Sequence, residues 1–200
     1  MKLLFANPSP YSAKVRLSAA LAGIEIEAVP TATADEPAEL LDANPLGKIP
    51  TLILEDGFAL YDSRAIVREI DRRSPGTLFP TGDGAARRET ERLESLGDGL
   101  CDCMLAIVYD RRTRPEDKWH LPYQEKQWEK VSRGLDWLDR TVDEREGRAI
   151  DAGTISLLSA LGYADLRHPR RRWRASRHVL AAEFDRLTTA IPDWEALKPQ

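Results

Sequence analysis

Residues 44–63 read NPLGKIPTLILEDGFALYDS, and this stretch decides the fold. Residues 51–55 are predicted as a strand. Asp56-Gly57 is the dipeptide of a tight two-residue turn, and it leads into a second strand over residues 58–61. Ser63 then begins a helix whose apolar stripe recurs at helical spacing. The stretch therefore predicts a β-hairpin followed directly by a helix.

The residues before this stretch follow a strand, helix, strand order. Residues 2–6 are predicted as a strand, and residues 10–22 as a helix that ends at a glycine. Residues 25–29 alternate polar and apolar side chains, as in a strand. Residues 36–43 fit either a short helix or an irregular loop. The whole order fits a four-stranded mixed sheet with helices on both faces.

The composition changes near residue 75, after which every long segment has helical periodicity. Prolines and glycines concentrate in residues 74–84, as in a linker between domains. Helices are predicted over residues 85–112, 119–144 and 151–164, and around Leu180, Phe184 and Leu187. The helix over 151–164 is apolar nearly all round, so it is expected to be central. We predict an α/β domain over residues 1–75 and an all-helical domain over residues 85–200.

Bulk properties exclude several classes of function. The net charge of −4 gives no overall attraction to nucleic acid or to an anionic membrane. No apolar run approaches the ~20 residues that span a bilayer, and the start of the chain is predicted to be a strand and not a signal peptide. Cys101 and Cys103 are expected to be free thiols in a reducing cytoplasm. The three histidines are scattered, so no metal site is predicted.

The arginine-rich segment 167–177 contains six arginines, and residues 170–174 alone are typical of a nucleic-acid patch. The segment is short, however, and it lies between helices of an acidic protein. We predict a solvated loop with Trp173 packed inward.

Chemistry is first suggested by Ser9-Pro10-Tyr11-Ser12, where the first strand meets the first helix. Serine before proline is typical of an N-cap, which by itself explains Ser9. A helix N-terminus also favours an anion, and a hydroxyl donor there would lower the pKa of a bound thiol from its free value of about 8.5. Ser9 is therefore predicted to hold a thiolate, with Ser12 as the second candidate. Serines stand where a redox protein carries Cys-x-x-Cys, which excludes dithiol exchange here.

The two ends of the hairpin supply further candidates. Lys48 can meet a carboxylate, and a cis bond between Ile49 and Pro50 would turn the Ile49 N–H and C=O toward an extended peptide. Ser63 is predicted to cap the next helix, whose free amides can take a carboxylate, while Asp62 offsets an ammonium. An ordinary loop and a plain helix cap remain open as alternatives.

Together these features describe a site for a small zwitterionic peptide. One end is held by its α-amino acid group, the middle pairs with a backbone edge, and a thiol lies beside Ser9. Glutathione has this shape and this pattern of charges.

On these motifs the chain resembles the glutathione transferase superfamily, and most closely the small bacterial YibF-like subgroup. The resemblance covers essentially the whole length. It rests on Ser9-Pro10-Tyr11, on residues 44–50, on Asp62-Ser63 and on Asp98-Gly99-Leu100.

The resemblance implies an α/β plus all-α fold, with a thioredoxin-like N-terminal domain of βαβ-ββα order before an all-helical C-terminal domain. It implies a cytoplasmic homodimer with its site in the cleft between the domains. Glutathione would be the co-substrate, a small hydrophobic electrophile would be the partner substrate, and no metal would take part.

The resemblance also implies roles for single residues. Ser9 would stabilise the thiolate and Lys48 would bind the glycine end. Ile49 before cis-Pro50 would pair with the cysteinyl backbone. The γ-glutamyl end would be held by Asp62 and Ser63.

The electrophile is expected against the long helix, near Tyr11, Met104, Tyr109 and Arg112. Ordinary core packing is the favoured alternative for Met104. The family usually opens its buried helix with Ser or Thr, two residues and then Asp. Here residues 151–154 read DAGT, with acid and hydroxyl exchanged, so a changed N-cap is expected.

Three functions remain open at this stage. The first is an enzyme that conjugates glutathione to electrophiles, or uses it for dehalogenation or peroxide reduction. The second is a binding or regulatory protein of the stringent-starvation type on the same scaffold. The third is a zeta-type isomerase, which the sequence of the first turn disfavours.

Overall fold

The computed structural model describes residues 1–143, 147 and 149–200. The last residue of the helix predicted over 119–144 lies outside these ranges. Within them, no helix is both long and apolar enough to cross a membrane.

The first part of the chain forms a four-stranded mixed sheet in the order β2-β1-β3-β4. Its strands are β1 (Lys2–Phe5), β2 (Glu27–Pro30), β3 (Thr51–Ile53) and β4 (Ala59–Leu60). β1 pairs parallel to β2 and antiparallel to β3, with Leu3 opposite Leu52. Both of these leucines are buried, so the register brings the apolar residues of neighbouring strands together in the core.

The hairpin turn between β3 and β4 forms where the sequence predicts it. Gly57 has a φ of 86°, a conformation that glycine adopts without steric cost. The Leu54 N–H donates to the Phe58 carbonyl at 2.8 Å, and the Phe58 N–H donates to the Asp56 carboxylate at 2.9 Å. After this turn, β4 leads directly into the helix that begins at Ser63.

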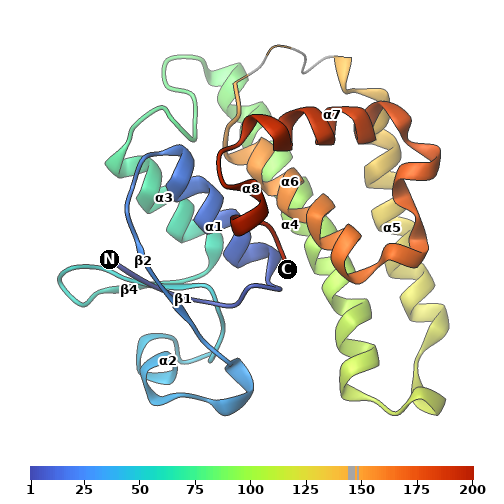
Figure 1. Ribbon diagram of the computed structural model, residues 1–200, viewed down its shortest axis with the longest axis horizontal. Helices are drawn as coiled ribbons and strands as arrows, with labels where there is room; N and C mark the ends of the chain where they lie inside the picture. Colours follow the sequence, from blue (N-terminus) through green and yellow to red (C-terminus); the bar gives the residue numbers. More distant parts are fainter. Residues whose placement is uncertain (144–146, 148) are drawn as a thin grey trace.

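Helices cover both faces of the sheet, as predicted. They are α1 (Pro10–Leu21), α2 (Ala38–Ala43) and α3 (Ser63–Arg73). α1 and α3 lie side by side on one face, and α2 lies on the other (Figure 1). The segment that fits a helix or a loop by sequence therefore forms the short helix α2.

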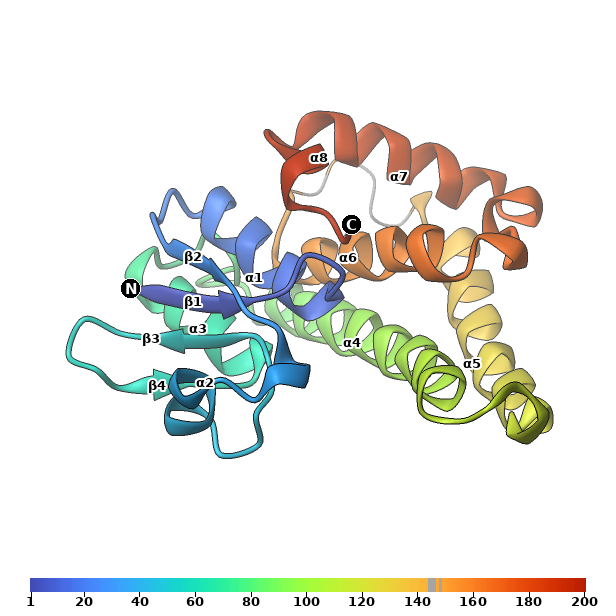
Figure 2. The same cartoon turned by 60° about the horizontal axis from the view of Figure 1, so that its bottom comes forward.

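The rest of the described chain is helical. Its helices are α4 (Gly84–Thr113), α5 (Leu121–Arg140), α6 (Ala152–Arg167), α7 (His178–Ala190) and α8 (Trp194–Leu197). α4 runs from the sheet to the far end of the molecule (Figure 2). The predicted α/β plus all-α fold is confirmed. The division of the chain into residues 1–75 and 85–200 stays a prediction.

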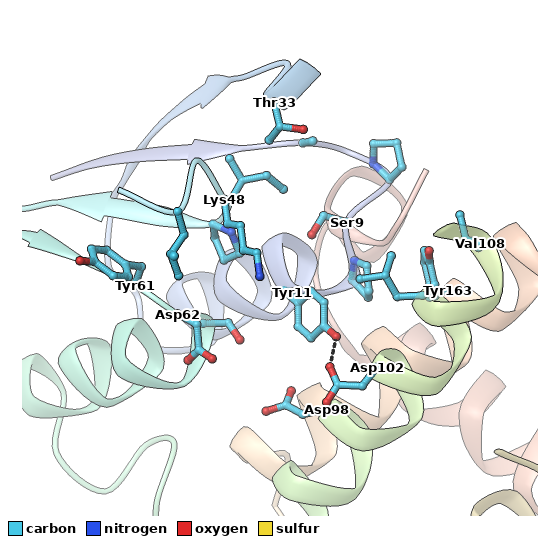
Figure 3. Close-up of a pocket in the computed structure, with 18 of the residues that line it drawn as sticks. Ser9, Tyr11, Thr33, Lys48, Tyr61, Asp62, Asp98, Asp102, Val108 and Tyr163 are labelled. Carbon is cyan, nitrogen blue, oxygen red and sulfur yellow. Dashed lines mark hydrogen bonds between the residues drawn. The ribbon is translucent and has the colours of Figure 1, made fainter. Parts of the chain in front are cut away.

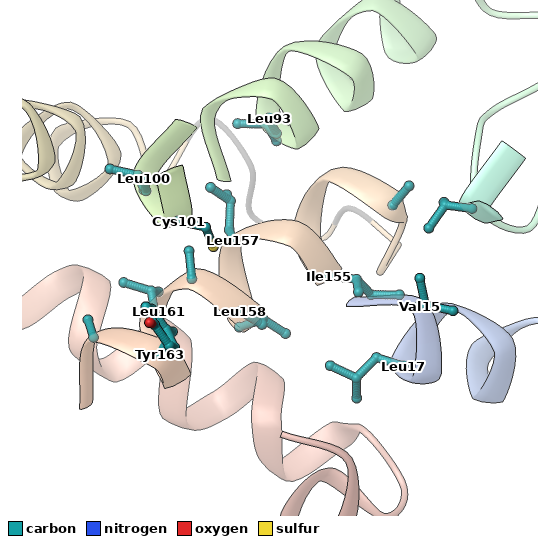
Figure 4. Packing of buried hydrophobic residues seen from close by; sticks show 14 of the residues in the cluster. Val15, Leu17, Leu93, Leu100, Cys101, Ile155, Leu157, Leu158, Leu161 and Tyr163 are labelled. Carbon is teal, nitrogen blue, oxygen red and sulfur yellow. The ribbon is translucent and has the colours of Figure 1, made fainter. Parts of the chain in front are cut away.

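α6 is the centre of the hydrophobic core, as its all-round apolar sequence predicts. It packs against both α4 and α1 (Figure 4). Ile155 and Leu158 are both buried, and Val15 of α1 belongs to the same cluster. The contact with α4 is close, because a Cβ added at Gly97 would lie 2.5 Å from the Ser156 hydroxyl.

The exchanged cap of α6 is present. Asp151 is the N-cap, and its carboxylate accepts the Thr154 N–H at 2.8 Å. Its second carboxylate oxygen accepts the Thr90 hydroxyl of α4 at 2.6 Å. The acid therefore caps one helix and joins it to another.

Candidate functional site

A cavity of about 590 Å³ lies where the sheet meets the helical part of the chain. Its walls come from the start of α1, the loop over residues 44–50, the start of α3, and one face each of α4 and α6. Figure 3 shows Ser9, Lys48 and Asp62 around this hollow, with Tyr11 between them and α4. These three candidates, far apart in sequence, are brought together.

Ser9 is the N-cap of α1, and its hydroxyl oxygen accepts the Ser12 N–H at 3.2 Å. Because that bond uses the oxygen as an acceptor, the hydroxyl proton remains available to a ligand in the cavity. Ser12 is fully buried, and its oxygen accepts the Ala6 N–H at 3.4 Å. Ser12 does not line the cavity, so the geometry separates the two serines.

The loop that carries Lys48 is held from inside by Asn44. This buried side chain donates to the Lys48 carbonyl at 2.9 Å and accepts the Leu46 N–H at 3.0 Å. Gly47, with a φ of 58°, completes the turn. The Ile49–Pro50 bond is cis, as predicted, and Lys48 and Ile49 both line the cavity.

The start of α3 corrects one expectation. Asp62, not Ser63, is the N-cap: its carboxylate accepts the Arg64 N–H at 3.0 Å. Ser63 is the first helical residue, and its side chain is buried. The reason is that the acid one position earlier already takes the free amide at this helix end. Both residues still line the cavity.

Three of the four residues expected near the electrophile line the cavity. Tyr11, Tyr109 and Arg112 line the cavity. Met104 does not: it is 1% exposed, and it belongs to the hydrophobic cluster. The pocket assignment of Met104 was wrong and the core alternative holds, because position 104 falls on the face of α4 that is turned away from the cavity.

The Tyr11 hydroxyl donates a hydrogen bond to Asp102 of α4. Burial and this bond raise the pKa of Tyr11 well above its usual value, so the phenol stays protonated. The bond ties the start of α1 to α4 across the cavity wall.

A buried ionic cluster behind the wall was not found by sequence reasoning. The Lys14 ammonium of α1 lies 2.9 Å from both oxygens of Asp98 and 3.3 Å from Glu94. Arg64 of α3 reaches Asp98 at 2.7 Å, and Arg68 reaches Glu94 at 2.8 Å. These pairs join α1 and α3 to α4. The signal available in sequence was a lysine between Ala13 and Val15 in a helix of mostly small and apolar residues, which indicates a buried partner.

Two cavity residues of α6, Tyr163 and Arg167, were also missed. They stand one helical turn apart, and turn the same face to the cavity. Burial raises the pKa of Tyr163 to about 12, although the nearby charges of Arg167 and Arg112 oppose that rise. The i, i+4 spacing of these two residues was visible in the sequence. The sequence did not show which face of α6 meets the cavity, because α6 is apolar nearly all round.

The remaining sequence features have structural roles. Trp173 is buried, as predicted, and its ring N–H donates to Asp165 at 2.6 Å. Arg174 also pairs with Asp165, at 2.8 Å. Cys101 and Cys103 are free thiols, and burial raises the pKa of Cys101 well above its usual value. Among the described residues, no group of three or more His, Cys, Asp or Glu is placed to hold a metal ion.

Comparison with known proteins gives the same picture. Residues 8–73 match the family model of the glutathione S-transferase N-terminal domain. A glutathione S-transferase from Methylobacillus flagellatus KT, solved with glutathione bound, is 36% identical; the match covers 100% of this chain and 99% of that one, with a TM-score of 0.91.

Two further relatives agree. A glutathione transferase family member from Pseudomonas fluorescens Pf-5, solved with bound S-(propanoic acid)-glutathione, is 31% identical over all of both chains, with a TM-score of 0.85. The uncharacterized GST-like protein YibF of Escherichia coli K12 is 26% identical, over 94% of this chain and 93% of its own. The motifs, the fold and these full-length likenesses lead to one conclusion: the chain belongs to the glutathione S-transferase family.

Proposed function

We propose that this protein binds glutathione in the cavity, holds it as a thiolate at Ser9 and transfers it to a small electrophile. The observation that carries the proposal is the Ser9 hydroxyl, which lines the cavity at the N-terminus of α1 with its proton free to donate. The relatives from Methylobacillus and Pseudomonas, which hold glutathione and a glutathione thioether, support it.

Ser9 would act on the ionisation of the thiol. A free thiol has a pKa of about 8.5 and is mostly protonated at neutral pH. A hydroxyl donor and the positive end of a helix both favour the thiolate, which is the stronger nucleophile. One hydrogen bond to a charged acceptor, at about 1.5–3 kcal/mol, is enough for a tenfold gain in thiolate.

The rest of the tripeptide would lie along the wall. Lys48 would pair with the glycine carboxylate, and the backbone of Ile49, before Pro50, would pair with the cysteinyl residue. Asp62 would face the γ-glutamyl ammonium. Ser63 would contribute its backbone amide at the start of α3, since its side chain is buried.

In the transfer step the thiolate sulfur bonds to an electrophilic carbon, and a leaving group such as chloride departs with the bonding electron pair. Conjugation and dehalogenation share this first step, and peroxide reduction uses the same thiolate. A role in detoxification, a homodimeric assembly and a cytoplasmic location belong to the same proposal.

The experiment compares Ser9→Ala with Asp83→Ala, using calorimetry with glutathione and initial rates with 1-chloro-2,4-dinitrobenzene. Asp83 is the N-cap of α4 and lies outside the cavity, so its variant loses a cap without touching the site. We expect Ser9→Ala to lose about tenfold or more in kcat/KM. Asp83→Ala should keep its rate.

Two outcomes would count against the proposal. Equal rates for wild type and Ser9→Ala would remove Ser9 from the mechanism. Glutathione binding by the wild type with no turnover of any electrophile would favour a regulatory protein of the stringent-starvation type.

A further inference from the structure

The end of the cavity farthest along α4 is basic. Asp98, Asp102, Leu105, Tyr109 and Arg112 repeat every three or four residues, so they form one stripe along α4, and all five line the cavity. Arg112 lies ten residues beyond Asp102, about 15 Å along the helix axis at 1.5 Å per residue. The stripe therefore changes from acidic beside Tyr11 to basic at its far end.

α6 supplies a second arginine to the cavity wall. Arg167 lines the cavity one turn beyond Tyr163, and the charges of Arg112 and Arg167 both act on the Tyr163 hydroxyl. That hydroxyl stays protonated at neutral pH and can donate a hydrogen bond. Two guanidinium groups and a phenol thus gather around one part of the wall.

These two guanidinium groups have no carboxylate partner within the described part of the chain. Their neighbours do have partners. Arg111 donates to Gln124 at 2.8 Å, Arg114 pairs with Asp110 at 3.0 Å, and Arg171 pairs with Glu125. Of the three arginines that line the cavity, Arg64 pairs with Asp98, and Arg112 and Arg167 are left to meet a ligand.

The acids of the cavity do not pair with these two arginines. Asp98 is held by Lys14 and Arg64, and Asp102 accepts the Tyr11 hydroxyl. The site proposed for glutathione already uses Lys48 and Asp62 as its ion-pairing groups. Arg112 and Arg167 are cationic groups of the cavity that neither this site nor a carboxylate of the described residues uses.

We propose that the electrophile carries a carboxylate, which Arg112, Arg167 and Tyr163 bind while its body lies against Leu105, Val108 and Tyr109. A guanidinium matches a carboxylate with two parallel hydrogen bonds, and the aromatic and aliphatic wall suits a flat ring. The inference rests on the proposed function, since it names the class of its second substrate.

For an aryl chloride that bears a carboxylate, the thiolate sulfur bonds to the ring carbon and the carbon–chlorine bond breaks. Chloride leaves with the bonding pair, and the proton of the thiol goes to water. The carboxylate is unchanged and fixes the orientation of the ring.

The experiment uses a matched pair of electrophiles, 4-chloro-3-nitrobenzoate and its methyl ester, which differ in charge. With kcat/KM divided by the uncatalysed rate constant, the wild type should prefer the acid about tenfold or more. Arg112→Gln and Arg167→Gln should each lower the acid value about tenfold, equivalent to about 1.4 kcal/mol, and leave the ester value within twofold. Arg170→Gln is the control, because this exposed arginine lies outside the cavity.

The outcomes separate the two proposals. Turnover of the ester without preference for the acid, or equal losses on both substrates in the arginine variants, would overturn the carboxylate inference and leave transfer intact. Turnover of neither would overturn the proposed function.

Binding of the two glutathione thioethers that these electrophiles would form, measured by calorimetry, tests the charge preference without turnover. Tighter binding of the carboxylated thioether, lost in the two arginine variants and kept in Arg170→Gln, would support the inference. Equal affinities would overturn it.

Discussion

The Lys14 ammonium lies 2.9 Å from both carboxylate oxygens of Asp98, which makes a lysine of the first helix part of the buried joint with α4. Replacing Lys14 with Met leaves Asp98 and Glu94 with one fewer cation in a buried setting. Breaking a buried pair from one side costs about 3–5 kcal/mol, and the remaining contacts of Arg64 and Arg68 place this variant near the lower end. Urea unfolding should show a loss of about 3 kcal/mol.

Lys2→Met is the matched control for that variant. Lys2 pairs with Glu39 at the surface, and exposed pairs contribute about 0–1 kcal/mol. Equal losses in the two lysine variants would contradict a stabilising role for the buried cluster.

His168 predicts a pH dependence of stability. It is 5% exposed, its Nε2 lies 3.2 Å from the Met104 carbonyl, and burial lowers its pKa from 6.5 to about 4. The nearby charges of Arg111, Arg167 and Arg171 act in the same direction. Between these pH values the unfolded chain binds a proton on this residue and the folded chain does not, so stability falls as the pH falls from 6.5 to 4.

The size of this effect is at most about 3 kcal/mol, from the pKa difference. His168→Phe should remove that part of the pH slope in urea titrations, whatever its stability at neutral pH. His178→Phe, at an exposed position, should keep the slope of the wild type. A wild-type slope in His168→Phe would show that other groups cause it.

Alanine substitutions at two glycines of α4 should change the free energy of unfolding in opposite directions. At Gly97 a Cβ would lie 2.5 Å from the Ser156 hydroxyl and 2.6 Å from its carbonyl carbon, so Gly97→Ala should cost about 2 kcal/mol through overpacking. At Gly99 a Cβ would meet nothing within 4 Å, and alanine should stabilise the helix by about 0.5–1 kcal/mol. Thermal unfolding of the two variants checks this, and a gain at both would mean that α4 and α6 can move apart.

Alanine substitutions of Ser9 and Ser12 should have different effects, one on the ionisation of the bound thiol and the other on stability. Ser9→Ala should raise the pKa of bound glutathione by about 1, measured from thiolate absorbance in the complex. Ser12→Ala should leave that pKa unchanged and lower stability by about 1–2 kcal/mol, because its buried oxygen accepts a backbone N–H. The reverse pattern would identify Ser12 as the group that acts on the thiol.

Local sequence signals predicted most of the fold because most elements begin or end at a capping or turn residue. Ser9 and Pro10 mark the start of α1, Asp56-Gly57 marks the hairpin, and the aspartate of residues 151–154 marks the start of α6. Boundaries moved by a residue or two where strands end without a turn residue, as at β2.

The site was predictable only where it is local. Ser9, Lys48 and Asp62 stand beside turns and helix starts, and such places expose backbone groups. Tyr163 and Arg167 line the cavity only because of the side that α6 turns toward it. That orientation is fixed by how α6 packs against α4. Lys14 depends on a partner eighty-four positions away at Asp98, which no local pattern reveals.

α4 is about 45 Å long, from 30 residues at 1.5 Å each, so its ion pairs and its cavity arginine lie far apart on one helix. The carboxylates that join it to α1 and α3, Glu94 and Asp98, lie in the first half of the helix, and Arg112 lies at its last turn. If the distal end binds the electrophile as proposed, substitutions there change substrate preference without removing the buried ion pairs. On that proposal, substrate specificity can evolve at one end of α4 while the ion pairs that hold the fold together are kept.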